Sequence, residues 1–361
     1  MKALRLIVLL TLLIMSVSAS SAQDNGLKPE ELEAIATFSA GMKYYEGKEV
    51  DINYPEAFRL FREASNKGSL EAVHFLGMMY QYGQGVDMDQ EEALKMFREA
   101  AVKGYEPAQI QLGFLYRYGF ANGIRDDHEA FKWYKMAAMQ GSKVGQYWLG
   151  SMYFEGLGVD KDYVEAAKWY RLSAEQGNRI SQYALAQMYF DGSGVVQDFS
   201  QSLKWFRLSA EQGYSDAQYN LGWMYEKGNG VAQDYLEALK WYSSAAVNDN
   251  VSAQSKLGWM YLTGTGVKQD SIEALKWFKL SSVEGNPTAQ NNLGVMYESG
   301  AGVVQDYIRA HMWYNVASAN GYENAPKWRD ALAAKMTLEA IEKAQAMAQE
   351  CLSSSYKDCG W

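Results

Sequence analysis

The stretch AQYNLGWMYEKGNGVAQDYLEALKWYSSAA, from Ala217 to Ala246, decides the fold of this chain. Its apolar residues recur three, four, seven and eight positions apart, which is the spacing of one face of an amphipathic helix. They form two runs: Ala217, Leu221, Met224 and Tyr225, and then Ala238, Trp241, Tyr242, Ala245 and Ala246. The stretch therefore predicts two helices, called helix A and helix B below, joined by a short glycine-containing loop.

The same unit recurs along most of the 361 residues. A Leu-Gly pair or a near variant ends at Gly77, Gly113, Gly150, Ala186, Gly222, Gly258 and Gly294, in steps of 36 residues and one step of 37. The extra residue falls between Gly119 and Ala130, which marks that segment as a loop. A degenerate unit at Gly41 makes eight units, starting near residues 34, 72, 108, 145, 181, 217, 253 and 289. A fixed period of this length is typical of solenoids, in which two-helix units stack in chain order.

Two recurring loop motifs suggest chemistry, but we interpret both as structural. The Gly228-Asn229-Gly230 motif has no strand before it and no Lys-Ser/Thr after it, so it does not fit a phosphate loop; glycine here ends helix A and permits positive φ. An Asp or Asn followed three residues later by Glu precedes helix B at Asn53/Glu56, Asp89/Glu92, Asp126/Glu129, Asp162/Glu165, Asp234/Glu237 and Asp270/Glu273. This is the spacing of a capping box, in which the Glu reaches back to the cap residue. Recurrence at that spacing argues against the paired carboxylates of a glycosidase.

Together the motifs form the pattern Ala-Gln-x-x-Leu-Gly-x-Met-Tyr-x-x-Gly-x-Gly-Val-x-x-Asp-x-x-x-Ala-x-x-Trp-Tyr/Phe, which resembles the Sel-one-like repeat, a relative of the tetratricopeptide repeat. The match covers about residues 30–325 and departs from the pattern at Glu49, where the second loop glycine is missing. The resemblance implies an all-α, right-handed α-solenoid that serves as a scaffold or adaptor, often in exported bacterial proteins. Some secreted relatives have a disulfide in each repeat and are linked to β-lactam binding or hydrolysis. These eight units contain no cysteine, so that activity is not carried over.

The first 22 residues read as a secretory signal peptide. Lys2 and Arg5 precede an apolar stretch from Leu6 to Met15, and small residues ending at Ala22 follow it. Such a stretch is short for a membrane span, which needs about 20 apolar residues, although an uncleaved anchor is the alternative. We expect cleavage after Ala22, a solenoid domain over residues 23–325, and a periplasmic or secreted protein that does not span the membrane.

Composition excludes two further classes. With 48% hydrophobic and 21% charged residues, the chain is too apolar for a disordered polyelectrolyte. Its formal net charge of -9 provides no basic stripe to neutralise phosphates, so nucleic acid is not expected as a partner.

The repeat period stops after Ala325, and residues 326–361 are expected to close the solenoid. Thr337 can cap a helix that starts at Leu338, whose apolar face would cover the last repeat. Cys351 and Cys359 are the only two cysteines, and in an oxidising compartment such a pair favours a disulfide. A zinc site is the competing interpretation, but it would need two further ligands at suitable spacing.

Repetition also separates packing positions from free ones. The helix B tryptophans recur in six consecutive units and are therefore expected in the core: Trp133, Trp169, Trp205, Trp241, Trp277 and Trp313. On helix A, the residues three before, one after and four after the Gly position vary and share one face, which we call the helix-A stripe. Unit by unit, the stripe reads His74, Met78, Gln81; Ile110, Phe114, Arg117; Tyr147, Ser151, Phe154; Tyr183, Gln187, Phe190; Tyr219, Trp223, Glu226; Ser255, Trp259, Leu262; and Asn291, Val295, Glu298.

The stripe carries few charges, which is unusual for a face in water. Either it is buried as a second core, or it is an aromatic groove that awaits a ligand. For Trp223 and Trp259 we favour exposure, because an indole N–H needs a polar partner. The candidate partner-binding residues are Phe114, Tyr147, Tyr183, Tyr219, Trp223 and Trp259.

No catalytic constellation can be nominated. His74, His128 and His311 lie in different repeats and cannot assemble one site if the repeats stack in order. We therefore expect no enzyme, no cofactor and no metal, but an exported scaffold that binds another exported or envelope protein or peptide through helix A. The alternative is an envelope glycan binder or a cell-wall or β-lactam-related enzyme, which the stacking-capable Tyr and Trp side chains of the stripe would suit.

Overall fold

The computed structural model describes residues 28–120, 123 and 125–360, and within these ranges the regular secondary structure is entirely α-helical. The segment interpreted as a signal peptide lies outside the described residues. The chain forms two compact units that divide after Gln176, and each is described by itself. We call them the N-terminal unit and the C-terminal unit.

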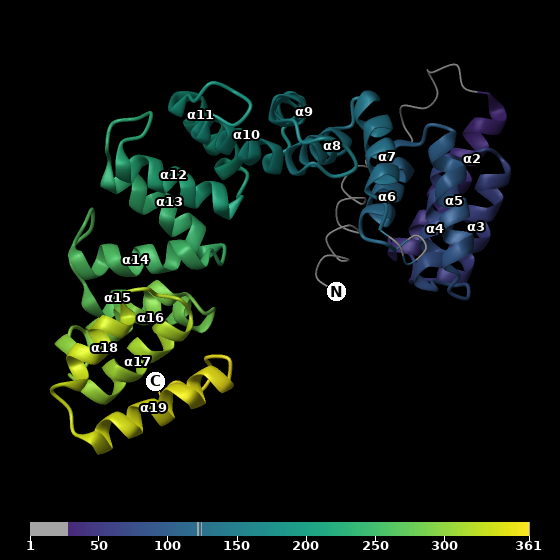
Figure 1. The fold of residues 1–361 in the computed structure, drawn as a ribbon. Coiled ribbons are helices and arrows are strands. Elements are labelled where there is room, and N and C mark those ends of the chain that lie inside the picture. The colour runs from purple at the N-terminus through teal and green to yellow at the C-terminus, as the bar shows by residue number, and fades with distance from the viewer. Residues whose placement is uncertain (1–27, 121–122, 124, 361) are drawn as a thin grey trace. The chain divides into compact units, whose positions relative to one another are not determined.

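The N-terminal unit contains four helix pairs (Figure 1). They are α2 (Pro29–Glu46), α3 (Tyr54–Asn66), α4 (Leu70–Tyr82), α5 (Gln90–Val102), α6 (Glu106–Arg117), α7 (Asp127–Met139), α8 (Lys143–Glu155) and α9 (Tyr163–Glu175). Even-numbered helices are helix A of a repeat and odd-numbered ones are helix B. Each helix packs against the next in chain order, as the stacking of two-helix repeats requires.

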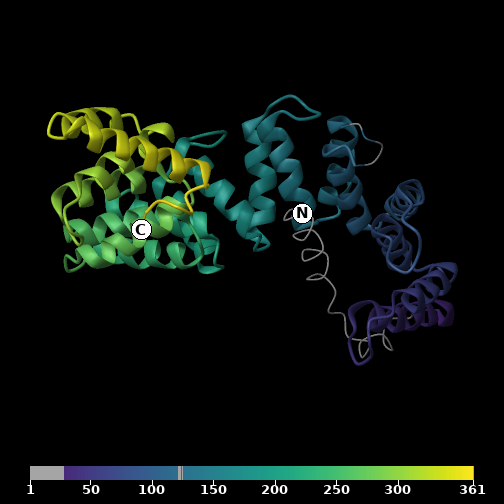
Figure 2. The same ribbon diagram turned by 90° about the horizontal axis from the view of Figure 1, so that it is seen from below.

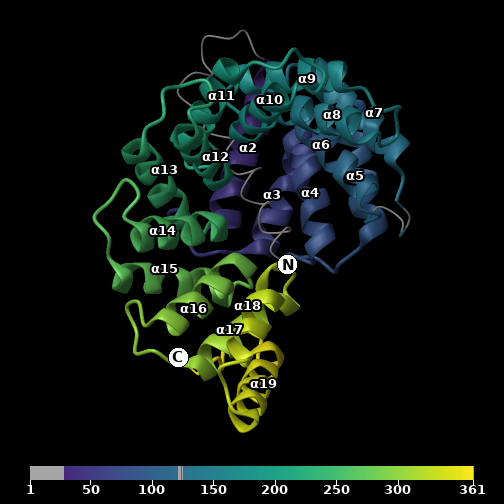
Figure 3. The ribbon, with the colours of Figure 1, turned by 60° about the vertical axis from the view of Figure 1, so that its left-hand side comes forward.

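The C-terminal unit continues the same pairing and adds two helices at its end. Its elements are α10 (Arg179–Asp191), α11 (Phe199–Glu211), α12 (Ser215–Lys227), α13 (Tyr235–Val247), α14 (Val251–Thr263), α15 (Ser271–Val283), α16 (Pro287–Ser299), α17 (Tyr307–Ala319), α18 (Ala325–Ala333) and α19 (Leu338–Ser353). Figure 3 shows α12, α14 and α16 following one another. The prediction of an all-α solenoid of two-helix repeats is confirmed.

The Leu-Gly glycine of helix A has a packing role that the sequence pattern did not reveal. A Cβ atom at Gly222 would lie 2.9 Å from Cδ1 of Tyr242, and one at Gly258 would lie 2.7 Å from Cδ1 of Phe278. The absence of a side chain therefore lets the aromatic ring of helix B lie directly on the backbone of helix A. This contact fixes how closely the two helices of a repeat approach.

The prediction that the helix B tryptophans lie in the core was wrong for four of the six. Trp205 and Trp313 are buried, but Trp133, Trp169, Trp241 and Trp277 are only half-buried. The aromatic residue after each tryptophan is the fully enclosed one, as at Tyr134, Tyr242, Phe278 and Tyr314. The reason is the glycine contact, because the ring that covers the glycine backbone must lie between the helices.

The loop motifs are structural, with one correction. Asp234 accepts hydrogen bonds from the backbone N–H groups of Leu236 and Glu237, so it caps α13 as predicted. The Glu of the motif does not reach back to the cap residue; Glu237 instead pairs with Lys240, one helical turn later. The second loop glycine is needed for close approach, because a Cβ at Gly230 would lie 2.5 Å from the carbonyl oxygen of Phe199 in the preceding repeat.

The last repeat is covered by α19, as Figure 2 shows with the yellow C-terminal helices lying over the green ones. Thr337 caps α19 by accepting a hydrogen bond from the N–H of Ala340 at 3.2 Å, as predicted. The structure adds α18, which the sequence pattern did not predict. Ala344, Ala348 and Cys351 are buried in the core that α19 shares with α16 and α17.

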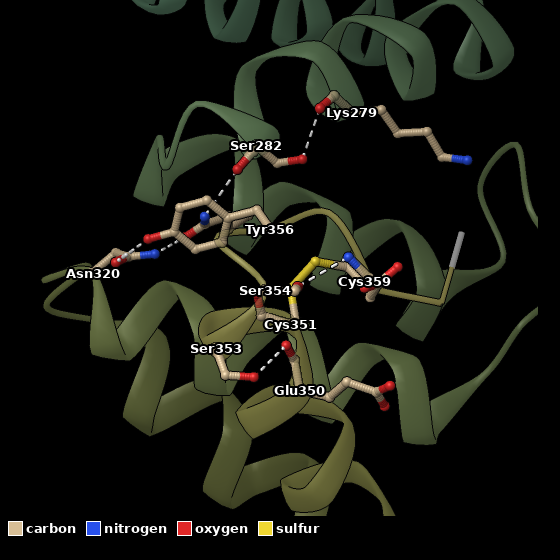
Figure 4. The surroundings of a disulfide bond; sticks show 11 residues. Lys279, Ser282, Asn320, Glu350, Cys351, Ser353, Ser354, Tyr356 and Cys359 are labelled. Atoms are coloured by element: carbon tan, nitrogen blue, oxygen red, sulfur yellow. Dashed lines mark hydrogen bonds between the residues drawn. A yellow bond between two sulfur atoms is a disulfide. The ribbon is translucent and has the colours of Figure 1, made fainter.

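In the structure Cys351 and Cys359 form a disulfide that closes the tail after α19 (Figure 4). Both half-cystines are buried. The hydroxyl of Tyr356, inside the closed loop, donates a hydrogen bond of 2.8 Å to Oδ1 of Asn320 at the end of α17. The tail is therefore held against the last repeat by a covalent loop and by a specific polar contact.

Candidate binding site

The helix-A stripe of the C-terminal unit borders two hollows that share Tyr219. The first has a volume of about 290 Å³ and is lined by Gln187, Phe190, Asp191, Phe206, Tyr219, Asn220, Trp223 and Met224. The second has a volume of about 300 Å³ and is lined by Tyr219, Ser252, Ser255, Lys256, Trp259, Asn286, Thr288 and Asn292. Neighbouring repeats thus contribute to two adjoining hollows that meet at Tyr219.

The first hollow is dominated by aromatic rings from two neighbouring repeats. Trp223 on α12 meets Phe190 on α10 edge to face, with ring centroids 5.5 Å apart. Phe190 in turn contacts Phe199 at 5.2 Å. The edge-to-face pair is favoured by the ring quadrupoles, and the two contacts together hold Phe190 in place. The half-buried Trp223 is therefore a preformed apolar surface with part of its ring still open to solvent.

The second hollow has a different character. Trp259 on α14 is 37% exposed, and the Nζ atom of Lys256 lies 4.8 Å from the centroid of its ring. The remaining side chains around it are mostly hydroxyls and amides from α14 and from the start of α16. The wall between the two hollows, Tyr219, rests on Tyr242 at a centroid distance of 5.6 Å.

The buried carboxylate of Glu226 binds side chains that lie next to the second hollow. Glu226 is 6% exposed, and its carboxylate accepts hydrogen bonds of 2.8 Å from the hydroxyl of Tyr242 and 2.9 Å from Nζ of Lys256. Burial alone would raise the pKa of Glu226, but the hydrogen bonds from Lys256 and Tyr242 outweigh it and the pKa is lowered. The carboxylate is thus charged near neutral pH, and it anchors Lys256 over Trp259.

Of the charged stripe residues, Arg117 and Glu226 are buried and Glu298 is half-buried. Arg117 is 9% exposed and donates from Nη2 to Glu155 at 2.8 Å. Glu298 accepts a 2.8 Å hydrogen bond from the hydroxyl of Tyr314, which repeats the Glu226 arrangement two repeats later. Where helix B carries Phe206 in place of tyrosine, the matching stripe residue is the apolar Phe190. A carboxylate on the stripe therefore marks a buried tyrosine hydroxyl that needs an acceptor.

The predicted binding residues are brought together only in part. Tyr219, Trp223 and Trp259 border the hollows of the C-terminal unit. Tyr183 in the same unit is half-buried against Phe206 and Tyr214, at 5.6 Å and 5.1 Å between ring centroids. Neither of the two interpretations of the helix-A stripe, as a second core or as an open groove, describes all of its residues.

Phe114 and Tyr147 belong to the N-terminal unit and form local aromatic clusters there. Phe114 contacts Tyr118 at a centroid distance of 4.6 Å, and Tyr147 contacts Trp148 at 5.0 Å. Their role in binding stays a prediction.

Apart from Ser255, sequence reasoning missed the polar residues of the second hollow. Lys256 and Asn292 line the second hollow from the same repeat position, two residues before the Gly position, and Asn220 lines the first hollow from that position on α12. Extending the stripe by one neighbouring helix position would have found them, because residues three apart share a helix face. Asn286 and Thr288 come from the turn that begins α16, which the stripe could not include.

Two observations concern other chemistry. In the part of the chain that the structure describes, no cluster of three or more His, Cys, Asp or Glu side chains is placed to hold a metal ion. Among those same residues, no helix is both long enough and apolar enough to cross a membrane.

The geometry and the repeat pattern define a solenoid protein, and comparisons with known proteins identify its class. The model of the Sel1 repeat family matches residues 34–69, 70–105, 106–142, 143–178, 179–214, 215–249, 251–286 and 287–322. The chain therefore belongs to the Sel1 repeat family. Proteins built from Sel1 repeats generally act as scaffolds for protein–protein interaction.

Solved structures include similar proteins. A Sel1 repeat protein from Oxalobacter formigenes is 33% identical, with a TM-score of 0.64 over 83% of this chain and 86% of that one. A protective antigen of uropathogenic Escherichia coli with an SLR fold is 30% identical, with a TM-score of 0.45 over 90% of this chain and 85% of that one. No curated protein matches the chain.

Proposed function

We propose that this protein is an exported, non-enzymatic scaffold that binds an exported or envelope protein through the helix-A stripe of its C-terminal unit. The observation that carries the proposal is the first hollow, where Phe190, Tyr219 and Trp223 border an open volume of about 290 Å³. Aromatic rings already fixed by neighbouring rings lose little conformational entropy on binding, so they are effective anchors for a partner.

The low charge of the first hollow suits the binding of a protein. Asp191 is the only charged residue that lines the first hollow, so the ligand there is recognised mainly through apolar and neutral polar groups. We expect one large apolar or aromatic side chain of the partner to enter the hollow beside Trp223, while Gln187 and Asn220 contact its main chain. Export rests on the basic, apolar and small-residue segments of the first 22 residues.

An affinity capture tests the proposal. The protein without residues 1–22 is immobilised and exposed to an envelope extract of its host, in parallel with the Trp223→Ala and Trp328→Ala variants. Trp328 is the matched control, because it is an exposed tryptophan (46%) on α18, outside both hollows. The proposal predicts a protein recovered by wild type and Trp328→Ala and lost with Trp223→Ala. Equal recovery by all three, or no recovered protein, contradicts it.

Export has its own test. The intact mass of the protein recovered from the host envelope should correspond to a chain that begins at Gln23. A product that still begins at Met1 would contradict the signal-peptide interpretation.

A further inference from the structure

The second hollow differs from the first in chemistry, although both share Tyr219. Two of its lining residues are aromatic, and the other six carry hydroxyl, amide or ammonium groups; none is aliphatic and none is acidic. Burial of a purely apolar side chain there would leave these polar groups unpaired, which costs free energy. The occupant must therefore combine a flat apolar face with a polar rim.

Several polar groups of the second hollow are uncommitted. The side chains of Ser252, Thr288 and Asn292 make no hydrogen bond within the described part of the chain. Asn286 uses its carboxamide oxygen to cap α16 by accepting from the N–H of Ala289, which leaves its NH₂ group to donate outward. Donors and acceptors thus stand available around the two rings.

The ring of Trp259 is held in place by Lys256, and the positive charge of Lys256 is compensated. Lys256 lies over Trp259 and forms an ion pair with the buried Glu226, so the positive charge of its ammonium is already neutralised. Because a carboxylate already balances the one cation, the hollow carries no strong preference for an anion. A neutral ligand fits the balance of charges.

From this combination we propose that the second hollow is a binding site for a neutral saccharide. A pyranose ring stacks on Tyr219 or on the face of Trp259 opposite Lys256, and Asn286, Thr288 and Asn292 bond its hydroxyls. A pyranose with equatorial substituents has C–H groups on its faces and hydroxyls at its rim, which is the pattern that this lining complements. A volume of about 300 Å³ accommodates a sugar ring and part of its neighbour. The site goes beyond the proposed protein-binding function and does not depend on it.

A titration with soluble disaccharides tests the site. Cellobiose and N,N′-diacetylchitobiose are added to the purified protein up to millimolar concentrations, and binding is measured by calorimetry and by tryptophan fluorescence. We expect at least one disaccharide to bind. Trp259→Ala and Asn292→Ala should each weaken that binding about tenfold or more, a change of about 1.4 kcal/mol.

Two control variants test whether the loss of saccharide binding is specific to the second hollow. Trp328→Ala removes another exposed tryptophan that also has a lysine beside it, Lys327 at 5.7 Å, and should leave saccharide affinity unchanged. Circular dichroism of each variant verifies that it is folded. Trp223→Ala, which alters the first hollow, should also bind the saccharide normally, so failure of the proposed protein partner and failure of this site are distinguishable.

The remaining outcomes are equally defined. Co-sedimentation with insoluble chitin or cellulose, in addition to disaccharide binding, assigns the ligand to a polymer, whereas binding of the disaccharide alone assigns it to a free oligosaccharide. No binding of either disaccharide, or binding that Trp259→Ala and Asn292→Ala leave intact, overturns the proposal. Binding of a tri-asparagine peptide without binding of the saccharides makes the hollow a peptide subsite and also overturns it.

Discussion

The Nζ atom of Lys256 lies 4.8 Å from the centre of the Trp259 ring, and the same atom is held at 2.9 Å by the carboxylate of Glu226 in the preceding repeat. A buried charge on one helix thereby sets the position of a surface ring on the next. The relationship links the interior of the C-terminal unit to the face that we propose for binding.

Replacing Lys256 should reveal the cost of that buried charge. Lys256→Met leaves Glu226 with Tyr242 and Lys227 as partners, and we expect a loss of about 2 kcal/mol in the free energy of unfolding, measured with urea. Lys276→Met removes a solvent-exposed ion pair with Glu273 and is the control, with little expected change. Equal stability of the two variants would show that the Glu226 network is not stabilising.

Position 242 should matter more for stability than position 241. Tyr242 is fully buried against Gly222, whereas Trp241 is half-buried, so Tyr242→Ala should cost about 3–5 kcal/mol and Trp241→Ala clearly less. Chemical denaturation of both variants measures the order. The reverse order would contradict the glycine-contact account of the core.

A single substitution should complete a series of hydrogen bonds that links the end of helix B to a glutamine of helix A in the same repeat. At the end of helix B, Gln212 donates to Gln182 at 2.7 Å and Asn320 donates to Gln290 at 2.8 Å. The equivalent residue for Gln254 is Glu284, which has no N–H to donate, and Oε1 of Gln254 is buried without a partner. Glu284→Gln should therefore raise the free energy of unfolding by about 1 kcal/mol, as measured by denaturation. Glu211→Gln, an exposed change one residue before such a position, should leave stability unaltered.

Acid should destabilise the N-terminal unit through His74. Its imidazole is enclosed by Phe75, Phe97 and Tyr105, and burial lowers the pKa of His74 from 6.5 to about 4. Between these values the unfolded chain binds the proton and the folded chain does not, so stability falls as pH drops from 7 to 4. The loss approaches about 3 kcal/mol. It should shrink in His74→Phe and persist in His128→Gln, when unfolding is followed as a function of pH.

The disulfide can be tested by thiol alkylation of the protein isolated from its host. Because Cys351 and Cys359 are bonded and buried, alkylation without reductant should label neither. Replacing both by serine should cost about 2–3 kcal/mol, because the unfolded tail is no longer closed into a loop. A thiol that reacts before reduction would return the zinc interpretation to consideration.

The repeat pattern was sufficient to predict the helices of the repeats, their order and most caps, because each depends on residues close in sequence. The contact between Gly222 and Tyr242 was missed because it joins two helices whose separation no local spacing encodes. For the same reason a stripe drawn on helix A alone could not include Asn286, which reaches the second hollow from a turn. The burial of Glu226 could not be predicted from the local sequence either, because its partner Tyr242 lies sixteen residues away on helix B.

The pairing of Tyr242 with Glu226 has a consequence for how such a chain can evolve. The helix B tyrosines Tyr242 and Tyr314 each bond a carboxylate from their own repeat, whereas the repeat with Phe206 carries the apolar Phe190 at that position. Recombination that cut between the two helices would join a hydroxyl to an apolar neighbour, or strand a carboxylate against a phenyl ring. For the repeats that hold such a pair, the smallest piece that can be duplicated or exchanged without a mismatch is therefore the complete helix pair.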